Sequence, residues 1–421
     1  MRKPSSVLFS NTGALLAIQI ANYVLPFLLI PYLTRILGVS LYGVVAFGLA
    51  IVQIACIITD YGFGLSATYK IAKQQNNKTE LQKIISAVMT CKILLLIPVA
   101  VLLTTFILGQ DKYDHYHTFF WLLLIPIAGQ TLQPIWFFQG IEKMACITAY
   151  TVVSRILYLV LVIWLVSTPD DHYLVAVANG VASIIAATIG IGMMLRLGYY
   201  PKWCGWHFVK DTFRESTEFF WSRAAVATYT AGGAIFLGLF SSSTQVAYYS
   251  AAEQLYKGAQ ALFSPLSQAL YPHMAKHQNF SLLLKILKAV VAASFVALIV
   301  GTFAGPWIIS LIFGPGFTNS YSILLLFMAT FLFSAPSILL GYPLLGALGD
   351  SKSANISVIY AGLLQLLLLI TCYILDFHLG WHIALTVLAT EIFVLIYRSK
   401  ASIKLIKGHP NNPLLKIKQN V

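Results

Sequence analysis

Charged residues are scarce in this sequence. Only 10% of the 421 residues are Asp, Glu, Lys or Arg, whereas 58% are hydrophobic, and the mean hydropathy is +0.80. A water-soluble domain carries about 25% charged residues. The composition therefore excludes an ordinary soluble domain and predicts an all-α membrane protein in which many helices cross the bilayer.

Acidic residues are scarcer than basic ones. The chain has 14 Asp and Glu against 27 Lys and Arg, which gives a formal net charge of +13. In a soluble protein this excess would indicate nucleic acid. Here the basic residues fall mostly in short segments between apolar stretches, where the positive-inside rule explains them. We therefore expect no nucleic-acid partner.

The chain also lacks the patterns of enzymes, metal sites and disulfide frameworks. Its five cysteines form no C-x-x-C pair, and its nine histidines are scattered. It contains no G-x-x-x-x-G-K-[ST], H-E-x-x-H or G-x-S-x-G motif. We expect no disulfide, no metal, no cofactor and no enzymatic activity. The first residues, MRKPSSVLFSNTG, lack an A-x-A-like cleavage site, so no removable signal peptide is expected.

Long apolar stretches predict about twelve spans. They cover residues 11–33, 41–60, 85–108, 118–138, 148–168, 174–195, 218–240, 247–270, 286–311, 321–345, 355–375 and 381–397. Six spans in each half predict an N-terminal bundle over 1–214 and a C-terminal bundle over 215–397. A basic tail over 398–421 follows, which we expect either to lie against anionic lipid or to bind a partner.

Lysine and arginine set the predicted orientation. With the N-terminus inside, about 21 of the 27 basic residues fall on the cytoplasmic side, and the outer loops hold only Arg35 and Lys112. Both termini of this multi-pass protein are therefore predicted in the cytoplasm.

Four cations fall inside predicted spans, namely Lys92, Arg155, Arg223 and Lys257. Each long side chain can return its charge to the headgroups, and for Arg223 this snorkelling is the favoured interpretation. Taken together, cations on several helices also predict a shared cationic cavity, which suits an anionic and particularly a phosphate-bearing substrate.

The span over 247–270 is unusually polar. Glu253 and Lys257 are four residues apart, so they share one helix face and can partly neutralise each other. The pair either joins helices structurally or lines a transport pathway, because charges at bilayer depth normally face a bundle interior or a wet cavity.

Four stretches resemble a known family. They are YLTRILGVSLYGVVAFGLAIVQ (32–53), TDYGF (59–63), PIWFFQGIEKM (134–144) and AYYSAAEQLYKGAQALFSPLSQALYP (247–272). They are similar to polysaccharide transporters of the multidrug/oligosaccharidyl-lipid/polysaccharide exporter superfamily and, more narrowly, to the Wzx-type O-antigen flippases. The resemblance covers nearly the whole chain in the number, length and order of spans.

The resemblance implies a flippase for an undecaprenyl-diphosphate-linked oligosaccharide in a bacterial inner membrane. It implies two six-helix bundles that form a V around a cationic central cavity and work by alternating access. Membrane lipids, a polysaccharide polymerase and a chain-length regulator are the implied partners.

Seven residues are predicted to form the site. Those expected to contact substrate are Lys92, Arg155, Arg223, Lys257 and Arg35. Glu253 and Asp60 are expected to couple an ion. Many members of the family carry an acid midway along the seventh span, where this chain has Ala231-Gly232-Gly233. That departure makes Glu253 the better candidate for coupling.

Three alternatives stay open. One is an ion-coupled multidrug and toxin exporter of the same superfamily, although cationic drugs would favour an acidic cavity. Another is a lipid II-type flippase, although such a protein typically has spans beyond twelve. The third is a membrane-embedded polysaccharide-assembly enzyme, such as an O-antigen polymerase or an acyltransferase. A polymerase would need a large outer loop, and the predicted outer loops are short.

Overall fold

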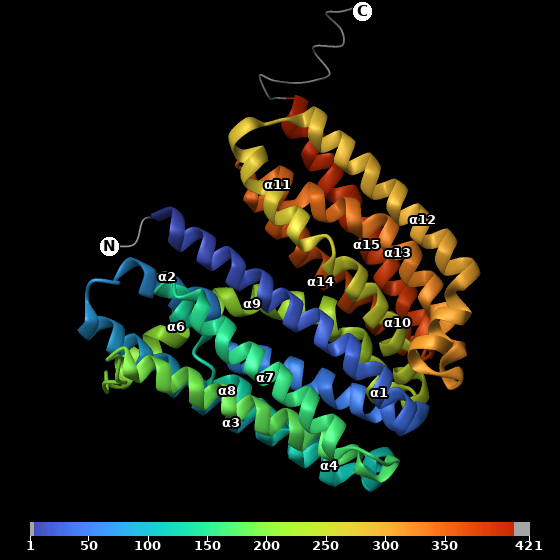
Figure 1. The fold of residues 1–421 in the computed structure, drawn as a ribbon, viewed down its shortest axis with the longest axis horizontal. Coiled ribbons are helices and arrows are strands. Elements are labelled where there is room, and N and C mark those ends of the chain that lie inside the picture. Colours follow the sequence, from blue (N-terminus) through green and yellow to red (C-terminus); the bar gives the residue numbers. More distant parts are fainter. Residues whose placement is uncertain (1–3, 408–421) are drawn as a thin grey trace, which may run out of the picture. The chain divides into compact units, whose positions relative to one another are not determined.

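Apolar helix formers fill most of the sequence, and a helix satisfies its own backbone hydrogen bonds in lipid. The computed structural model of the protein describes residues 4–407, and over that range it consists of helices and their connections without a strand. Figure 1 labels most of these helices along the chain. The predicted all-α class is confirmed.

Contacts divide the chain into two compact units, with the boundary between Ala224 and Ala225. The elements that begin in unit 1 are α1 (Pro4–Asp60), α2 (Phe63–Lys73), α3 (Lys78–Leu108), η1 (Asp111–Tyr116), α4 (His117–Leu122), α5 (Leu124–Leu132), α6 (Ile135–Gly140), α7 (Met144–Leu165), η2 (Pro169–Tyr173), α8 (Leu174–Arg196) and α9 (Trp206–Phe240). Unit 2 contains the end of α9 and α10 (Ser243–Ala261), α11 (Ser264–His277), α12 (Phe280–Phe313), η3 (Pro315–Ser320), α13 (Tyr321–Leu340), η4 (Gly341–Gly346), α14 (Ser351–Ile374) and α15 (Gly380–Lys407).

Ten segments of the described residues are long and apolar enough to cross a membrane. This makes the chain a multi-pass membrane protein, but it does not confirm the predicted number of twelve spans. Two physical features account for the difference. The predicted spans 11–33 and 41–60 lie in the single run of α1, where Gly38 (φ 70°) forms a kink. The predicted span 247–270 is helical but too polar, because Glu253, Lys257 and neighbouring glutamines lie within it.

Helix α15 extends beyond residue 397, where the last span was predicted to end. Arg398 lies within this helix, and its guanidinium donates hydrogen bonds to Ser357 Oγ at 2.9 Å and to the Ser337 carbonyl at 2.8 Å. The first ten residues of the predicted tail are therefore helical. Residues 408–421 lie outside the described part of the chain.

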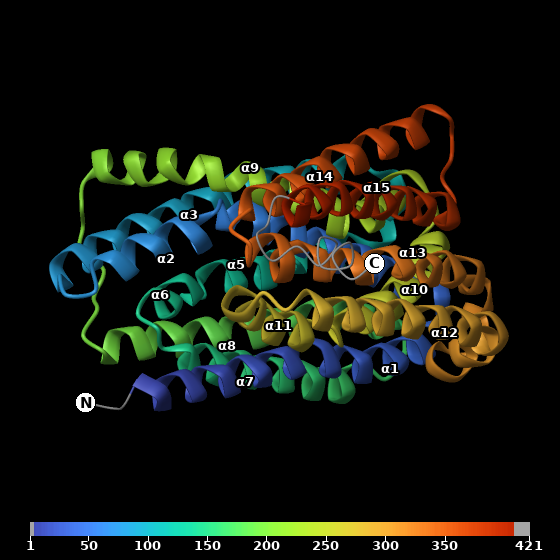
Figure 2. The ribbon, with the colours of Figure 1, turned by 90° about the horizontal axis from the view of Figure 1, so that it is seen from above.

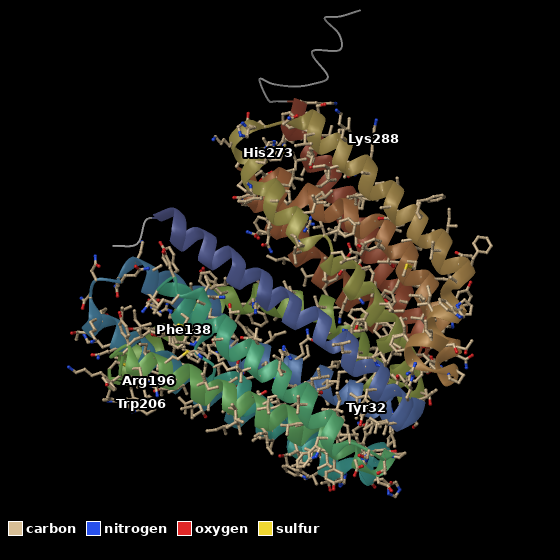
Figure 3. All side chains as sticks on the ribbon, viewed as in Figure 1. Tyr32, Phe138, Arg196, Trp206, His273 and Lys288 are labelled. Carbon is tan, nitrogen blue, oxygen red and sulfur yellow. The ribbon has the colours of Figure 1, made fainter. Side chains whose placement is uncertain are left out.

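The core of unit 1 surrounds the short helix α6. Phe137 and Phe138 are fully buried in a cluster that also contains Phe63 from α2 and Met194 from α8. Figure 3 labels Phe138 in this region and Trp206 at the surface. Because two adjacent aromatic side chains anchor α6 in the core, the helix has a fixed rotation.

The first half of α9 closes the same unit. Tyr61, at the turn between α1 and α2, stacks on Phe213 and Phe220 of α9, with ring centroids 4.2 and 4.5 Å apart. One turn further, the hydroxyls of Ser66 and Ser216 lie 2.7 Å apart in a buried hydrogen bond. These contacts fix residues 213–220 of α9 to α2 and to the turn before it.

Candidate functional site

Unit 1 contains a cavity of about 530 Å³. It is lined by Cys56, Asp60, Gly64, Leu65, Lys92, Gln130, Thr131, Gln133, Ile135, Trp136, Gln139, Met144, Ile147, Thr151, Ser154, Arg155, Tyr158, Asn179, Ser183 and Arg223. Its size lies within the range of about 300–1,000 Å³ that is usual for small-molecule sites. The lining is polar for a cavity within membrane-spanning helices.

Lys92 of α3 is only 4% exposed, so its charge needs partners. Its ammonium lies 3.3 Å from Asp60 Oδ1, at the end of α1, and donates to the Thr131 carbonyl at 3.3 Å. Thr131 is in the last turn of α5, where carbonyls lack helical partners and the helix dipole is negative. Lys92 therefore joins the ends of α1 and α5.

The helix is interrupted directly after Leu132, between α5 and α6. Gln133 is extended (φ −63°, ψ 126°), as expected for a residue before proline, and Pro134 has no N–H to continue the helix. Figure 2 labels α5 and, next to it, the short helix α6 that follows it in the chain. The break brings Gln133, Trp136 and Gln139 to the cavity wall.

Helix α6 is held from behind by α2 and by the turn that follows it. Thr68 Oγ1 donates to the Trp136 carbonyl at 3.0 Å, and Gln75 Nε2 donates to the Gly140 carbonyl at 2.9 Å. A side chain at Gly140 would overlap Ile71, so only glycine permits this approach. The hydrogen bonds orient the opposite face of α6 toward the cavity.

Helix α7 contributes Arg155. Beside it, Ser154 Oγ donates to the Ala182 carbonyl of α8 at 3.0 Å, which sets the rotation of α7. Tyr158, one turn along, also lines the cavity, and its buried hydroxyl has no hydrogen-bond partner among the described residues. Arg223 reaches the cavity from α9 and is exposed.

The cavity has an excess of positive charge. Its wall carries three cations, Lys92, Arg155 and Arg223, and one carboxylate, Asp60. Four amide side chains accompany them, those of Gln130, Gln133, Gln139 and Asn179. Guanidinium groups bind phosphate and carboxylate, and amides both donate and accept hydrogen bonds. The arrangement can bind a polar, anionic ligand.

Unit 2 places Glu253 and Lys257 together. The Lys257 ammonium lies 2.8 Å from Glu253 Oε2 and donates to the Thr230 carbonyl of α9 at 3.2 Å. The predicted i,i+4 pair therefore forms and also connects α10 with α9.

Sequence reasoning gave no role to Glu391 of α15, which is only 3% exposed. It accepts a hydrogen bond from Tyr229 of α9 and another from Tyr256 of α10, the latter at 3.3 Å. Gln260 Nε2 in turn donates to the Tyr256 hydroxyl at 2.7 Å. An acid within a predicted span was the available signal, but its tyrosine partners lie 162 and 135 residues away.

The structure thus brings four of the seven predicted site residues, Asp60, Lys92, Arg155 and Arg223, to one cavity. Glu253 and Lys257 form their own pair in unit 2. Arg35 is exposed on α1, three residues before the kink, and does not line the cavity. The amides were not predicted as site residues because uncharged glutamines in a span attract no attention. The sequence signals were the Gln133-Pro134 step and the stretch PIWFFQGIEKM, which contains Gln139.

Comparisons with known proteins agree with this picture. The sequence profile described as "Polysaccharide biosynthesis protein" matches residues 8–278. A protein of Escherichia coli (strain K12) named "Putative O-antigen transporter" is 29% identical over 395 residues, which are 91% of this chain and 94% of that protein. A protein of the same name from Shigella dysenteriae is 28% identical over 93% of this chain and 99% of its own.

Solved structures share the fold at low identity. The lipid II flippase MurJ, in an inward closed conformation, has a TM-score of 0.70 and 13% identity over 93% of this chain and 87% of that chain. An inward-facing multidrug resistance MATE family transporter of the MOP superfamily has a TM-score of 0.68 and 12% identity over 92% and 96%. These likenesses show that the chain shares the fold of these transporters.

Proposed function

The chain belongs to the family of polysaccharide biosynthesis proteins, and on this premise we propose that it is a flippase for a lipid-linked oligosaccharide of O-antigen or related polysaccharide assembly. The cargo is an undecaprenyl-diphosphate-linked repeat unit, moved from the cytoplasmic to the periplasmic leaflet of a bacterial inner membrane. The relatives named as O-antigen transporters support this proposal.

The observation that carries the proposal is the excess of positive charge in a cavity that also presents amides. A diphosphate with a sugar chain cannot cross about 30 Å of hydrocarbon unaided. Arg155 and Arg223 replace the hydration of the diphosphate, and the amides replace that of the sugars. The polyprenyl tail stays in lipid.

Lysine–carboxylate pairs give a proposed means of coupling to an ion gradient. Lys92 pairs with Asp60 in unit 1, and Lys257 pairs with Glu253 in unit 2. Protonation of the carboxylate releases the lysine, which changes the charge offered to the cargo and biases the inward and outward states of an alternating-access cycle. Glu253→Gln protein that transports equally well at every pH would remove Glu253 from this scheme.

A drug exporter is the competing function, because a MATE transporter shares the fold. Its cationic cargo would be repelled by the excess of positive charge in the cavity. The relatives are named as transporters, which also speaks against a polysaccharide-assembly enzyme. We further propose that both termini lie in the cytoplasm, and the excess of basic residues in the loops on that side supports this orientation.

Genetic complementation tests the function. The gene is deleted in its native host, surface polysaccharide is stained, and the strain is restored with wild type, Arg155→Ala or the control Arg196→Ala at the end of α8. We expect wild type and the control to restore polysaccharide and equally expressed Arg155→Ala to fail. Unchanged polysaccharide in the deletion strain, together with lost dye efflux, would support the drug exporter instead.

A further inference from the structure

The break between α5 and α6 presents uncharged polar side chains to the cavity. Gln133, Trp136 and Gln139 are spaced three residues apart and all line the cavity. The amides of Gln133 and Gln139 make no side-chain hydrogen bond to the described part of the protein. Trp136 is 1% exposed, and its buried indole N–H likewise donates to no atom of residues 4–407.

Polar groups at a cavity wall that make no hydrogen bond to the protein can bind a ligand. The indole N–H of Trp136 is an exception to the rule that buried polar groups are hydrogen-bonded, and such exceptions call for an explanation. The amides of Gln133 and Gln139 are partly exposed at the same wall. Each of the two amides can donate and accept hydrogen bonds, and the indole can only donate. A ligand that satisfies Gln133, Trp136 and Gln139 must therefore offer both donors and acceptors. Sugar hydroxyl and acetamido groups have this property, whereas a phosphate only accepts.

We propose that Gln133, Trp136 and Gln139 form a sugar subsite that binds the saccharide next to the diphosphate. The proposal rests on the proposed function and adds which part of the cavity wall binds the sugar. Arg155, on α7, binds the phosphates, so phosphate and sugar are held by different helices around the same cavity.

The part of the wall that carries Gln133, Trp136 and Gln139 is rigid, as recognition of a ligand requires. Thr68 of α2 and Gln75 in the turn after α2 hold the carbonyls of Trp136 and Gly140, and Pro134 fixes the entry to α6. Lys92 fixes the preceding end of α5 through Thr131 and is itself neutralised by Asp60. Broken helices within a transporter commonly line the substrate site, because the backbone there is irregular only where it faces a cavity.

Binding to two lipids separates the sugar subsite from the phosphate contacts. Full-length protein in lipid nanodiscs is titrated with undecaprenyl diphosphate and with the lipid-linked saccharide extracted from the deletion strain of the native host. We expect wild type to bind the glycosylated lipid at least about tenfold more tightly, since a site that hydrogen-bonds a ligand rejects the analogue lacking those groups.

Gln133→Leu and Gln139→Leu keep the side-chain bulk and remove the amide. We expect each to reduce the preference for the glycosylated lipid by several-fold and to leave the affinity for undecaprenyl diphosphate unchanged. Arg155→Gln is expected to weaken both lipids equally. Gln53→Leu, the same change at an exposed position of α1, is the matched control.

The outcomes distinguish the two proposals. Wild type that binds neither lipid contradicts the proposed function. Wild type that binds both lipids equally, or a Gln133→Leu/Gln139→Leu double variant that keeps the full preference, overturns the sugar subsite alone. Thermal unfolding of each variant in the same nanodiscs, unchanged from wild type, shows that lost preference is not lost fold.

Discussion

Two charged side chains, Lys92 and Glu391, are almost completely buried in the described part of the chain, and the protein stabilises them differently. Lys92 has an opposite charge, Asp60, and the carbonyl end of α5. Glu391 has tyrosine hydroxyls from two other helices. A cation paired with an anion and an acid held by neutral donors respond differently to loss of a partner, and each response can be measured.

Asp60→Asn is expected to destabilise unit 1. It leaves the Lys92 ammonium, 4% exposed, without its counter-charge, and we expect the free energy of unfolding to fall by about 2 kcal/mol. Lys92→Met added to Asp60→Asn should restore most of this loss, because the uncompensated charge is gone. Denaturation in detergent followed by tryptophan fluorescence measures both, with exposed Asp111→Asn as control.

Tyr229→Phe is expected to destabilise unit 2 by about 2 kcal/mol, since it removes a donor to a buried carboxylate. In a Glu391→Gln background the same change should cost about 1 kcal/mol, because a neutral acceptor loses less. A double-mutant cycle isolates this difference. Equal costs in the two backgrounds would mean that Glu391 is not charged in the folded protein. Tyr360→Phe, at a half-exposed ring on α14, is the control.

At the scale of elements, close backbone approach holds the α5–α6 break in place. Gly190 of α8 faces the ring of Pro134, and a side-chain Cβ there would lie 2.9 Å from Pro134 Cδ and 3.4 Å from Tyr150. Gly192, two residues further along the same helix, has nothing within 4 Å. One helix thus offers both a test position and its control.

Gly190→Ala is expected to displace Pro134 and to reduce transport, as judged by surface polysaccharide in the complemented strain. Stability should fall by about 1–3 kcal/mol, the usual cost of overpacking. Gly192→Ala should be neutral or stabilising by up to about 1 kcal/mol, because alanine is the better helix former. If the two variants behave alike, Gly190 does not position the break.

The elements also show how far sequence alone reaches. Apolar stretches located the helices because burial in lipid is set by local composition, and deep lysines and arginines were visible for the same reason. Which of them meet is a tertiary property, because nothing in the local sequence shows that Lys92 pairs with Asp60. The amides of Gln133 and Gln139 were missed because their importance comes from a break that turns them to the cavity.

At the scale of the whole molecule, Cys56 offers a probe of access. It lines the cavity and donates to Gln130 Oε1 at 3.6 Å. In a variant whose other four cysteines are serine, we expect an anionic methanethiosulfonate to react several-fold faster than a cationic one, because the cavity is positive.

Applying these reagents from one side of the membrane at a time measures which side the cavity faces. Arg155→Gln should reduce the charge preference. Equal rates for the two reagents in wild type would contradict a cationic cavity. Labelling from both sides, modulated by added lipid-linked saccharide, is the result that alternating access predicts.

The stacking of Tyr61 on Phe213 and Phe220 has a consequence for biosynthesis. The helix that completes unit 1 is made last: Ser66 and its partner Ser216 are 150 residues apart. Protein synthesis adds about 5–20 residues per second, so α9 leaves the ribosome on the order of ten seconds or more after α2. During that interval Tyr61 and Ser66 can contact lipid, an insertase or a chaperone. Variants that weaken the contact between α2 and α9 should therefore be recognised by membrane quality control before the protein meets any cargo.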